Sequence, residues 1–474
     1  MYEQQLQSLL DSFDGSVNWV AGDVKINEEQ AVRNQIETLV RAAVLDENES
    51  NRYLARFLIR KIALALDIVP SSIHDLYLAR GRGDVPNSFT TPAINLRSLS
   101  YYAAKAIYHI AEEINAGAFI FEIARSETGY TDQRPSEYAA NVLGAAIAEG
   151  YRGPVFIQGD HYQISASRYQ DNPDPEIQAL KDLTGEALDA GFFNIDVDAS
   201  TLVDLSRESV PEQQELNCEL TAMFTKFIRH LEPDGVTVSI GGEIGEVGEG
   251  NSTEEELRAF MDGYNQELSS AAPDAAGLSK ISILTGTSHG GVVLPDGSIK
   301  EVSVAFDVLQ QLGRVARDSY GLGGAVQHGA STLPEEAFNK FVEAEALEVH
   351  LATNFQNILY DRLPKDLVED IYSYLDEHHA HERKEGQTDD QFYYKTRKRA
   401  LGEYKDQIWN LSQEKLTEIY NAWETQFRNL FDRLSLADTR KYVDKFVHPV
   451  KIDPEIEGYL LGDVEPEDTS DLAD

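Results

Sequence analysis

The sequence predicts an α/β fold, a (β/α)8 TIM barrel with helical N-terminal and C-terminal extensions. Between residues 88 and 363, eight short apolar runs alternate with amphipathic segments, which is the strand count of such a barrel. The flanking regions instead carry apolar residues at helical spacing. An open, doubly wound sheet is the alternative, and eight full repeats favour closure.

The composition excludes several classes of protein. Asp and Glu number 81 against 41 Lys and Arg, and the net charge of −40 would be repelled by nucleic-acid phosphates. A single cysteine, Cys218, excludes a disulfide framework and a cysteine-based zinc ribbon. Without a membrane-spanning apolar run or a basic start, we expect a cytoplasmic protein. The dispersed acids fit either a salt-rich cytoplasm or an ordinary acidic enzyme.

Residues 1–87 form the expected N-terminal extension, with helices over 4–10, 28–45 and 51–67. In the last of these, apolar side chains recur every three or four residues. The segment Arg80-Gly-Arg-Gly-Asp is a loop signal that ends the region.

Residues 88–363 form the expected barrel domain. Its strands are predicted at 92–96, 118–123, 154–158, 192–197, 236–240, 281–285, 324–327 and 347–351. Its helices are predicted near 99–115, 136–149, 176–190, 212–231, 254–269, 303–319 and 334–344.

Residues 364–447 form the expected helical C-terminal extension, and 448–474 an acidic, solvated tail. One helix of the extension has a continuous apolar stripe and Ser412 as its N-cap. The stripe consists of Leu416, Ile419, Trp423, Phe427, Leu430 and Leu434. We interpret it as a surface for core packing in preference to a partner site.

Histidines follow three of the predicted barrel strands, at His161, His289 and His328. Barrel enzymes place reacting groups at these strand ends, and three imidazoles with one open position are typical of catalytic zinc. The alternative is that each histidine separately caps a strand or binds a loop. His230, His378, His379 and His381 fall on polar helices and are interpreted as surface residues.

Glycines accompany two of these histidines. Gly290-Gly291 and Gly329-Ala-Ser331 lie where backbone N–H groups can turn toward a phosphate. Such pairs are usually tight turns, but their position beside candidate metal ligands favours a binding role.

Six short motifs follow the predicted strands in order: Asp160-His161, Asp198-Ala199-Ser200, Glu243-Ile-Gly-Glu-Val-Gly-Glu249, Thr287-Ser-His289-Gly290, His328-Gly329-Ala-Ser331 and His350-Leu-Ala-Thr353. Their order and spacing across 88–360 resemble those of the class II (metal-dependent) fructose/tagatose-bisphosphate aldolases. The resemblance implies a zinc ion, or another divalent metal, bound by His161, His289 and His328, with Glu243 and Asp198 near it. It also implies that Asp160 is the acid/base and that Glu249, or less so Glu246, is the second proton-transfer group. The residues that it implies as contacts of a substrate phosphate are Gly290, Gly329, Ser331 and Thr353.

The sequence departs from the family pattern at three points. His350 stands where the family has Asn. This difference affects the contacts that the protein makes with the enediolate, which is left when a ketose is cleaved between C3 and C4. The segment after His161 is longer and more polar than expected. The order Glu249-Gly250 reverses the usual Gly-Glu, so the loop acid could be a neighbouring residue.

The resemblance implies cleavage of fructose 1,6-bisphosphate to dihydroxyacetone phosphate and glyceraldehyde 3-phosphate, by a homo-oligomer without nucleic-acid or membrane partners. An aldolase for tagatose bisphosphate or another phosphorylated ketose is the nearest alternative. A non-catalytic accessory subunit of such an aldolase is the second, and the three histidines favour the enzyme.

Overall fold

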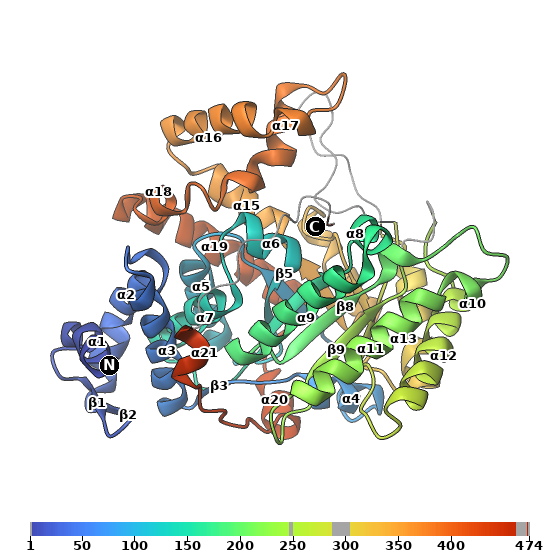
Figure 1. Cartoon of the computed structure of the whole chain (residues 1–474), viewed down its shortest axis with the longest axis horizontal. Helices are drawn as coiled ribbons and strands as arrows, with labels where there is room; N and C mark the ends of the chain where they lie inside the picture. Colours follow the sequence, from blue (N-terminus) through green and yellow to red (C-terminus); the bar gives the residue numbers. More distant parts are fainter. Residues whose placement is uncertain (1, 246–249, 287–303, 461–471, 473–474) are drawn as a thin grey trace.

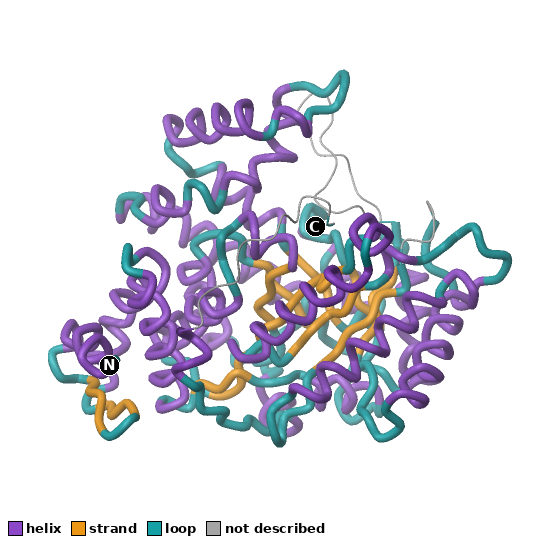
Figure 2. Tube along the Cα trace, in the orientation of Figure 1, coloured by secondary structure: helices purple, strands orange, loops and turns teal. Residues whose placement is uncertain are grey.

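Eight parallel strands close into a barrel, in the order in which they occur along the chain (Figures 1 and 2). They are β4 (Thr91–Asn95), β5 (Ile120–Ala124), β7 (Ile157–Gln163), β8 (Asn194–Asp198), β9 (Ser239–Glu243), β10 (Lys280–Ile283), β11 (Ala325–Gln327) and β12 (Glu348–Leu351). The computed structural model describes residues 2–245, 250–286, 304–460 and 472. The predicted (β/α)8 barrel is confirmed.

Helices connect the strands and surround the barrel (Figure 2). They are α5 (Ser100–Glu113), α6 (Arg125–Tyr130), α7 (Pro135–Glu149), α8 (Ala166–Asp171), α9 (Pro173–Ala190), α10 (Val210–Gln213), α11 (Glu215–Leu231), α12 (Glu254–Ala271), α13 (Phe306–Tyr320), α14 (Asn339–Glu343) and α15 (Thr353–Tyr360). Helices α7 and α9 end at Gly150 and Gly191 with φ of 73° and 94°. Glycine adopts this left-handed conformation without strain, which fixes where both helices stop.

The N-terminal region contains more than the predicted helices. Its helices are α1 (Glu3–Leu10), α2 (Glu29–Leu45), α3 (Glu49–Ala65) and α4 (His74–Gly81). An antiparallel hairpin of β1 (Val17–Val20) and β2 (Asp23–Ile26) lies between α1 and α2. Ala21 and Gly22 both have positive φ, which suits a two-residue hairpin turn. We did not predict this hairpin, because Ala-Gly is a weaker signal than Asn-Gly.

A short parallel pair lies outside the barrel, formed by β3 (Ile68–Pro70) and β6 (Gly153–Val155). The segment 154–158 was predicted as one barrel strand. It is divided between β6 and the start of β7, and Phe156 lies between the two strands. The barrel strand therefore begins and ends later than predicted.

The C-terminal region is helical, as predicted. It comprises α16 (Lys365–His378), α17 (Asp389–Thr396), the 3-10 helix η5 (Arg397–Ala400), α18 (Lys405–Trp409), α19 (Gln413–Arg433), α20 (Arg440–Phe446) and α21 (Ile456–Leu460). Ser412 accepts a hydrogen bond from the Lys415 N–H, so the predicted N-cap of α19 is confirmed. The predicted stripe is buried, and Trp423 Nε1 donates to the Phe355 carbonyl at 3.0 Å.

The described part of the predicted acidic tail contains a helix. Helix α21 lies within 448–474, and its Tyr459 ring lies 5.9 Å from the ring of Phe57 on α3. Residues 461–471, 473 and 474 of this tail lie outside the described residues.

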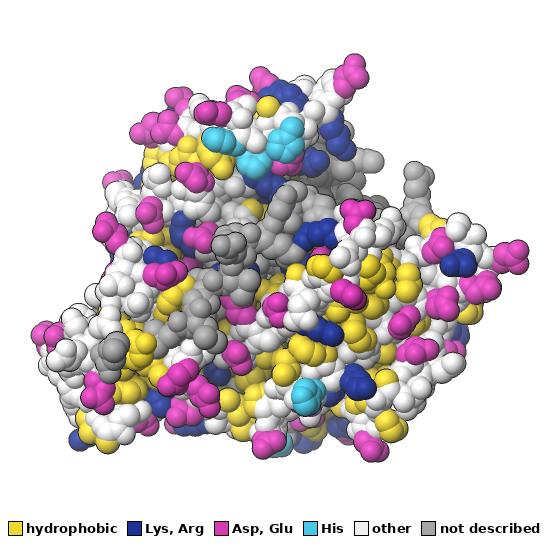
Figure 3. Space-filling view, in the orientation of Figure 1, with side chains coloured by type: hydrophobic (Ala, Val, Ile, Leu, Met, Phe, Trp, Pro, Cys, Tyr) yellow, Lys and Arg dark blue, Asp and Glu magenta, His cyan; other side chains and the backbone are white. Residues whose placement is uncertain are grey.

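Acidic side chains are spread widely over the face shown in Figure 3, and basic ones are sparser. The distribution agrees with the excess of acids in the sequence. None of the described helices is long and apolar enough to cross a membrane.

Candidate active site

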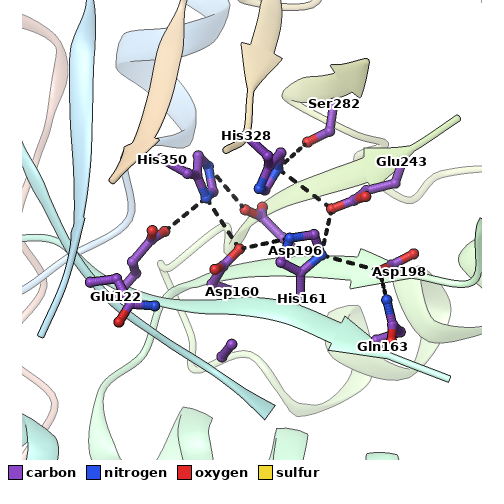
Figure 4. A network of polar contacts seen from close by, with 12 residues as sticks. Glu122, Asp160, His161, Gln163, Asp196, Asp198, Glu243, Ser282, His328 and His350 are labelled. Carbon is purple, nitrogen blue, oxygen red and sulfur yellow. Dashed lines mark hydrogen bonds and ion pairs between the residues drawn. The ribbon is translucent and has the colours of Figure 1, made fainter. Parts of the chain in front are cut away.

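A bulge in β7 directs two consecutive side chains toward the same site. The pairing of β7 with β8 shifts register between Gly159 and Tyr162, and His161 has a φ of +40°. In a regular strand, neighbouring side chains point to opposite faces. The bulge instead lets Asp160 and His161 both face the polar cluster inside the barrel (Figure 4).

His161 is surrounded by acids from the next two strands (Figure 4). Its Nδ1 lies 3.2 Å from Oδ2 of Asp198, the last residue of β8. The same atom lies 3.1 Å from Oε1 of Glu243, the last residue of β9. His328 follows β11 directly, and its Nε2 lies 3.5 Å from Glu243 and 3.0 Å from Ser282 Oγ. The His161 and His328 rings are 4.4 Å apart, so these residues form one cluster.

His350 on β12 occupies the other side of the site. Its Nδ1 lies 3.1 Å from Oδ1 of Asp160 and 3.0 Å from Oε2 of Glu122 on β5. Its Nε2 lies 2.6 Å from Oε1 of Glu348, and its ring lies 4.0 Å from that of His328. His350 therefore connects the His161–His328 cluster with the carboxylates of Asp160, Glu122 and Glu348. It is also the residue that stands where the family pattern has Asn.

A buried lysine supports this arrangement from inside the barrel. Lys280 Nζ on β10 lies 2.9 Å from Oδ2 of Asp196 and 2.7 Å from Oε1 of Gln158, and it also pairs with Glu348. These contacts join four strands. Burial opposes the charge on Lys280, but Asp196 and Glu348 raise its pKa above the ordinary value.

Carboxylates outnumber cations in this interior. The acids are Glu122, Asp160, Asp196, Asp198, Glu243 and Glu348. The described side chains that contact them and can carry a positive charge include Lys280, His161, His328 and His350. Burial and the charge of Asp198 raise the pKa of Glu243 to about 7. Burial alone would lower the pKa of His161, but Glu243 and Asp160 raise it well above its usual range.

The donor set fits a divalent metal. Among the described residues, Asp160, His161 and His328 each offer an atom within 4.8 Å of the others, and His161, Asp198 and Glu243 do the same. Imidazole and carboxylate ligands suit zinc and other first-row divalent ions. A bound cation would also offset the excess of buried negative charge.

Polar groups of the predicted phosphate site line the same cavity as Asp160. Ser331 Oγ accepts a hydrogen bond from the Thr353 N–H at 3.2 Å, which joins the loops after β11 and β12. Gly329 has a φ of 69° and lies with both in the cavity wall, as does Arg97. This cavity is bordered by His161, His328 and His350 as well.

Three predicted site residues, His289, Gly290 and Glu249, lie outside the described residues, as does Glu246. Glu122, Lys280 and Arg97 are not among the predicted site residues. A signal existed for Glu122, which is a charged residue within an otherwise apolar predicted strand. Lys280 directly precedes the predicted strand 281–285 and gave no such signal. His230, His378 and His379 lie on or at the end of outer helices, as expected.

The family model described as fructose-bisphosphate aldolase class-II matches residues 86–422, well over half of the chain. The chain belongs to this family. Class II aldolases are generally metal-dependent lyases that act on phosphorylated sugars. The match extends beyond the barrel into α19, so it includes helices that the sequence motifs did not reach.

Solved structures are similar to this chain at low sequence identity. A protein from Sinorhizobium meliloti 1021, described as a probable tagatose 6 phosphate kinase, has a TM-score of 0.50 and 14% identity, covering 75% of this chain and 90% of its own. Fructose-bisphosphate aldolase from Campylobacter jejuni has a TM-score of 0.45 and 16% identity, covering 77% of this chain and 93% of its own. The search of curated proteins finds no match.

Proposed function

We propose that this class II aldolase uses a divalent metal, most simply zinc, to cleave a ketose bisphosphate, with fructose 1,6-bisphosphate as the substrate. One observation carries the proposal. The bulge in β7 brings Asp160 beside the His161–His328 cluster, in the cavity that Ser331 and Thr353 also line. Proton transfer, metal binding and phosphate binding are thereby combined in one site.

Proposed metal ligands are His161, His328 and His289, with Glu243 and Asp198 close to His161. When bound, the metal would supply a Lewis acid that polarises the ketose oxygens. The acids around His161 would orient its ring and keep it in place. Ser331, Gly329, Thr353 and Gly290 would hold the phosphate on the ketone half.

In the proposed cleavage, Asp160 accepts the proton of the C4 hydroxyl. The C4–O bond becomes the carbonyl of the leaving aldehyde, the C3–C4 bond breaks, and its electron pair passes into the ketone half. A second group, proposed as Glu249, returns a proton to C3 so that dihydroxyacetone phosphate forms. Such positioned proton transfer contributes typically about 10²- to 10⁴-fold.

A panel of phosphorylated ketoses, assayed with and without a chelator, tests the proposal. We expect chelator-sensitive cleavage, fastest for fructose 1,6-bisphosphate. Faster cleavage of tagatose bisphosphate would replace the substrate and keep the reaction class. Absence of cleavage for every sugar, in protein loaded with metal, would instead indicate an accessory subunit.

A further inference from the structure

A second cavity lies outside the strand barrel, between α3, the end of α9 and α21 (Figure 1). Its volume is about 300 Å³, at the lower end of the range for small-molecule sites. It shares no described lining residue with the cavity beside Asp160. Tyr53, Leu188, Ile452 and Tyr459 make part of its wall apolar. The size and the lining suit a small organic molecule.

One buried cation in the wall of this cavity has no ionic partner among the described residues. Arg60 on α3 is 3% exposed, and its Nη1 donates a hydrogen bond to the Ala190 carbonyl at 2.8 Å. Its Nε takes no hydrogen-bond partner within the described part of the chain. At Gly191, directly after α9, a Cβ would lie 2.0 Å from Arg60 Nη1, so the glycine leaves room for the guanidinium. A carbonyl dipole does not neutralise a buried charge, and a counter-charge is therefore missing.

Two other buried cations of α3 have acidic partners. Arg56 Nη2 lies 2.8 Å from Oε2 of Glu137, and Lys61 Nζ lies 2.5 Å from Oδ1 of Asp453. Burial lowers the pKa of Arg60, but a guanidinium remains charged in proteins. Arg60 therefore differs from its neighbours on the same helix, and it lines a cavity where a ligand could supply the missing charge.

Two carboxylates of the cavity wall also lack a partner. Asp189 on α9 and Glu455, just before α21, form neither an ion pair nor a side-chain hydrogen bond with any residue that the structure describes. Partial burial and the charge of Glu455 raise the pKa of Asp189, which shows that these two acids repel each other. The lining acids Glu186 and Asp453 are instead paired with cations. The described wall thus offers one unpaired cation and two unpaired acids.

We propose that this cavity binds an α-amino acid with an apolar side chain. Its carboxylate would pair with the guanidinium of Arg60, and its ammonium group with Asp189 and Glu455. These two acids would repel a purely anionic ligand, and a purely cationic one would leave Arg60 without a counter-charge. The apolar side chain would contact Leu188 and Ile452. The site is separate from the proposed active site and does not depend on the aldolase reaction.

Isothermal titration calorimetry of the 474-residue chain with L-valine, L-leucine, L-methionine and L-phenylalanine tests the site. We expect at least one of them to bind. The deaminated acid and the decarboxylated amine of the best binder separate the two charges; for leucine these are 4-methylpentanoate and 3-methylbutylamine. Each should bind at least about tenfold more weakly than the amino acid, because one charged contact is missing.

Arg60→Gln should weaken binding of the amino acid by about 10- to 100-fold, because it removes the partner of the carboxylate. The double variant Asp189→Asn/Glu455→Gln alters only exposed side chains, so it should fold normally and weaken binding by about fivefold or more. Asp182→Asn is the matched control, since Asp182 is an exposed acid of α9 that does not line the cavity. It should leave the affinity unchanged.

Melting temperatures of the ligand-free variants establish that they are folded. Absence of binding for all four amino acids would overturn the proposal. Unchanged affinity in Arg60→Gln, or in the double variant if Arg60→Gln does not fold, would also overturn it. Binding of the deaminated acid as tightly as the amino acid would exclude the proposed contact of the ammonium group and with it the ligand class.

Discussion

Nδ1 of His350 lies 3.1 Å from Oδ1 of Asp160, so β12 directly contacts the carboxylate proposed as the acid/base. The other ring nitrogen of His350 lies 2.6 Å from Glu348. Burial raises the pKa of Asp160, but His161 and then His350 hold it well below its usual range. The imidazole thus keeps Asp160 in place and in its ionised form.

His350→Asn should destabilise the protein. Asparagine can bond to Asp160 but leaves Glu122 and Glu348 without the imidazole, and breaking a buried ion pair costs about 3–5 kcal/mol. Denaturant unfolding of the metal-free protein measures this, with exposed His378→Asn as the control. A change below about 1 kcal/mol would show that Lys280 alone stabilises Glu348.

Asp160→Asn should reduce kcat by about two to four orders of magnitude while metal content stays near that of the wild type. The amide keeps the size of the side chain and its hydrogen bond with His350, but it cannot accept the proton. Turnover and elemental analysis of the same preparation check this. Near-normal turnover would assign the proton transfer to another group.

Zinc should stabilise the protein more at pH 8 than at pH 6. Burial and Asp198 raise the pKa of Glu243 to about 7, and burial and Asp160 raise that of Glu122 to about 8. In the unfolded chain glutamate has a pKa of about 4.3. Between that pH and the raised pKa values of Glu243 and Glu122, the folded state therefore binds more protons than the unfolded state. The metal-free protein therefore loses stability as pH rises through this window, and zinc competes with the bound proton.

Melting temperatures with and without zinc at both pH values measure this difference. In Glu243→Gln the zinc-induced rise in melting temperature should differ less between pH 6 and pH 8. The glutamine side chain has no titrating proton that zinc could displace. An equal rise in melting temperature at pH 6 and pH 8 would exclude Glu243 from the metal site.

Ser331→Ala should weaken substrate binding by roughly 1.5–3 kcal/mol, since it removes one hydrogen bond to a charged acceptor. The hydroxyl also accepts the Thr353 N–H, so the loops after β11 and β12 would lose a contact. KM for phosphorylated and unphosphorylated ketoses is the measurement. The same effect on both sugars would argue against a phosphate at Ser331.

Salt should stabilise this acidic protein. At a net charge of −40, the carboxylates repel one another most at low ionic strength, where the Debye length is about 30 Å at 0.01 M. The melting temperature between about 0.05 and 3 M KCl distinguishes two cases, because screening is nearly complete at about 1 M. A continued rise above that range indicates adaptation to a salt-rich cytoplasm, and a plateau by a few tenths molar indicates simple screening.

The barrel and most of its helices could be predicted from local patterns in the sequence. Strands and helices have different apolar periods, and these local patterns identified the alternation and the buried stripe of α19 from Leu416 to Leu434. The order of the motifs also identified the family. Periodicity could not reveal the β1–β2 hairpin, whose Ala21-Gly22 turn is fixed by backbone conformation.

The assembly of the site, in contrast, depends on the tertiary structure. Regular alternation would separate Asp160 from His161, and the bulge after Gly159 removes that separation. Glu122, Lys280 and His350 come from three strands that are far apart in the sequence, and closure of the barrel brings them into one buried network. Interactions across such distances depend on the path of the whole chain, which no local pattern of residues encodes.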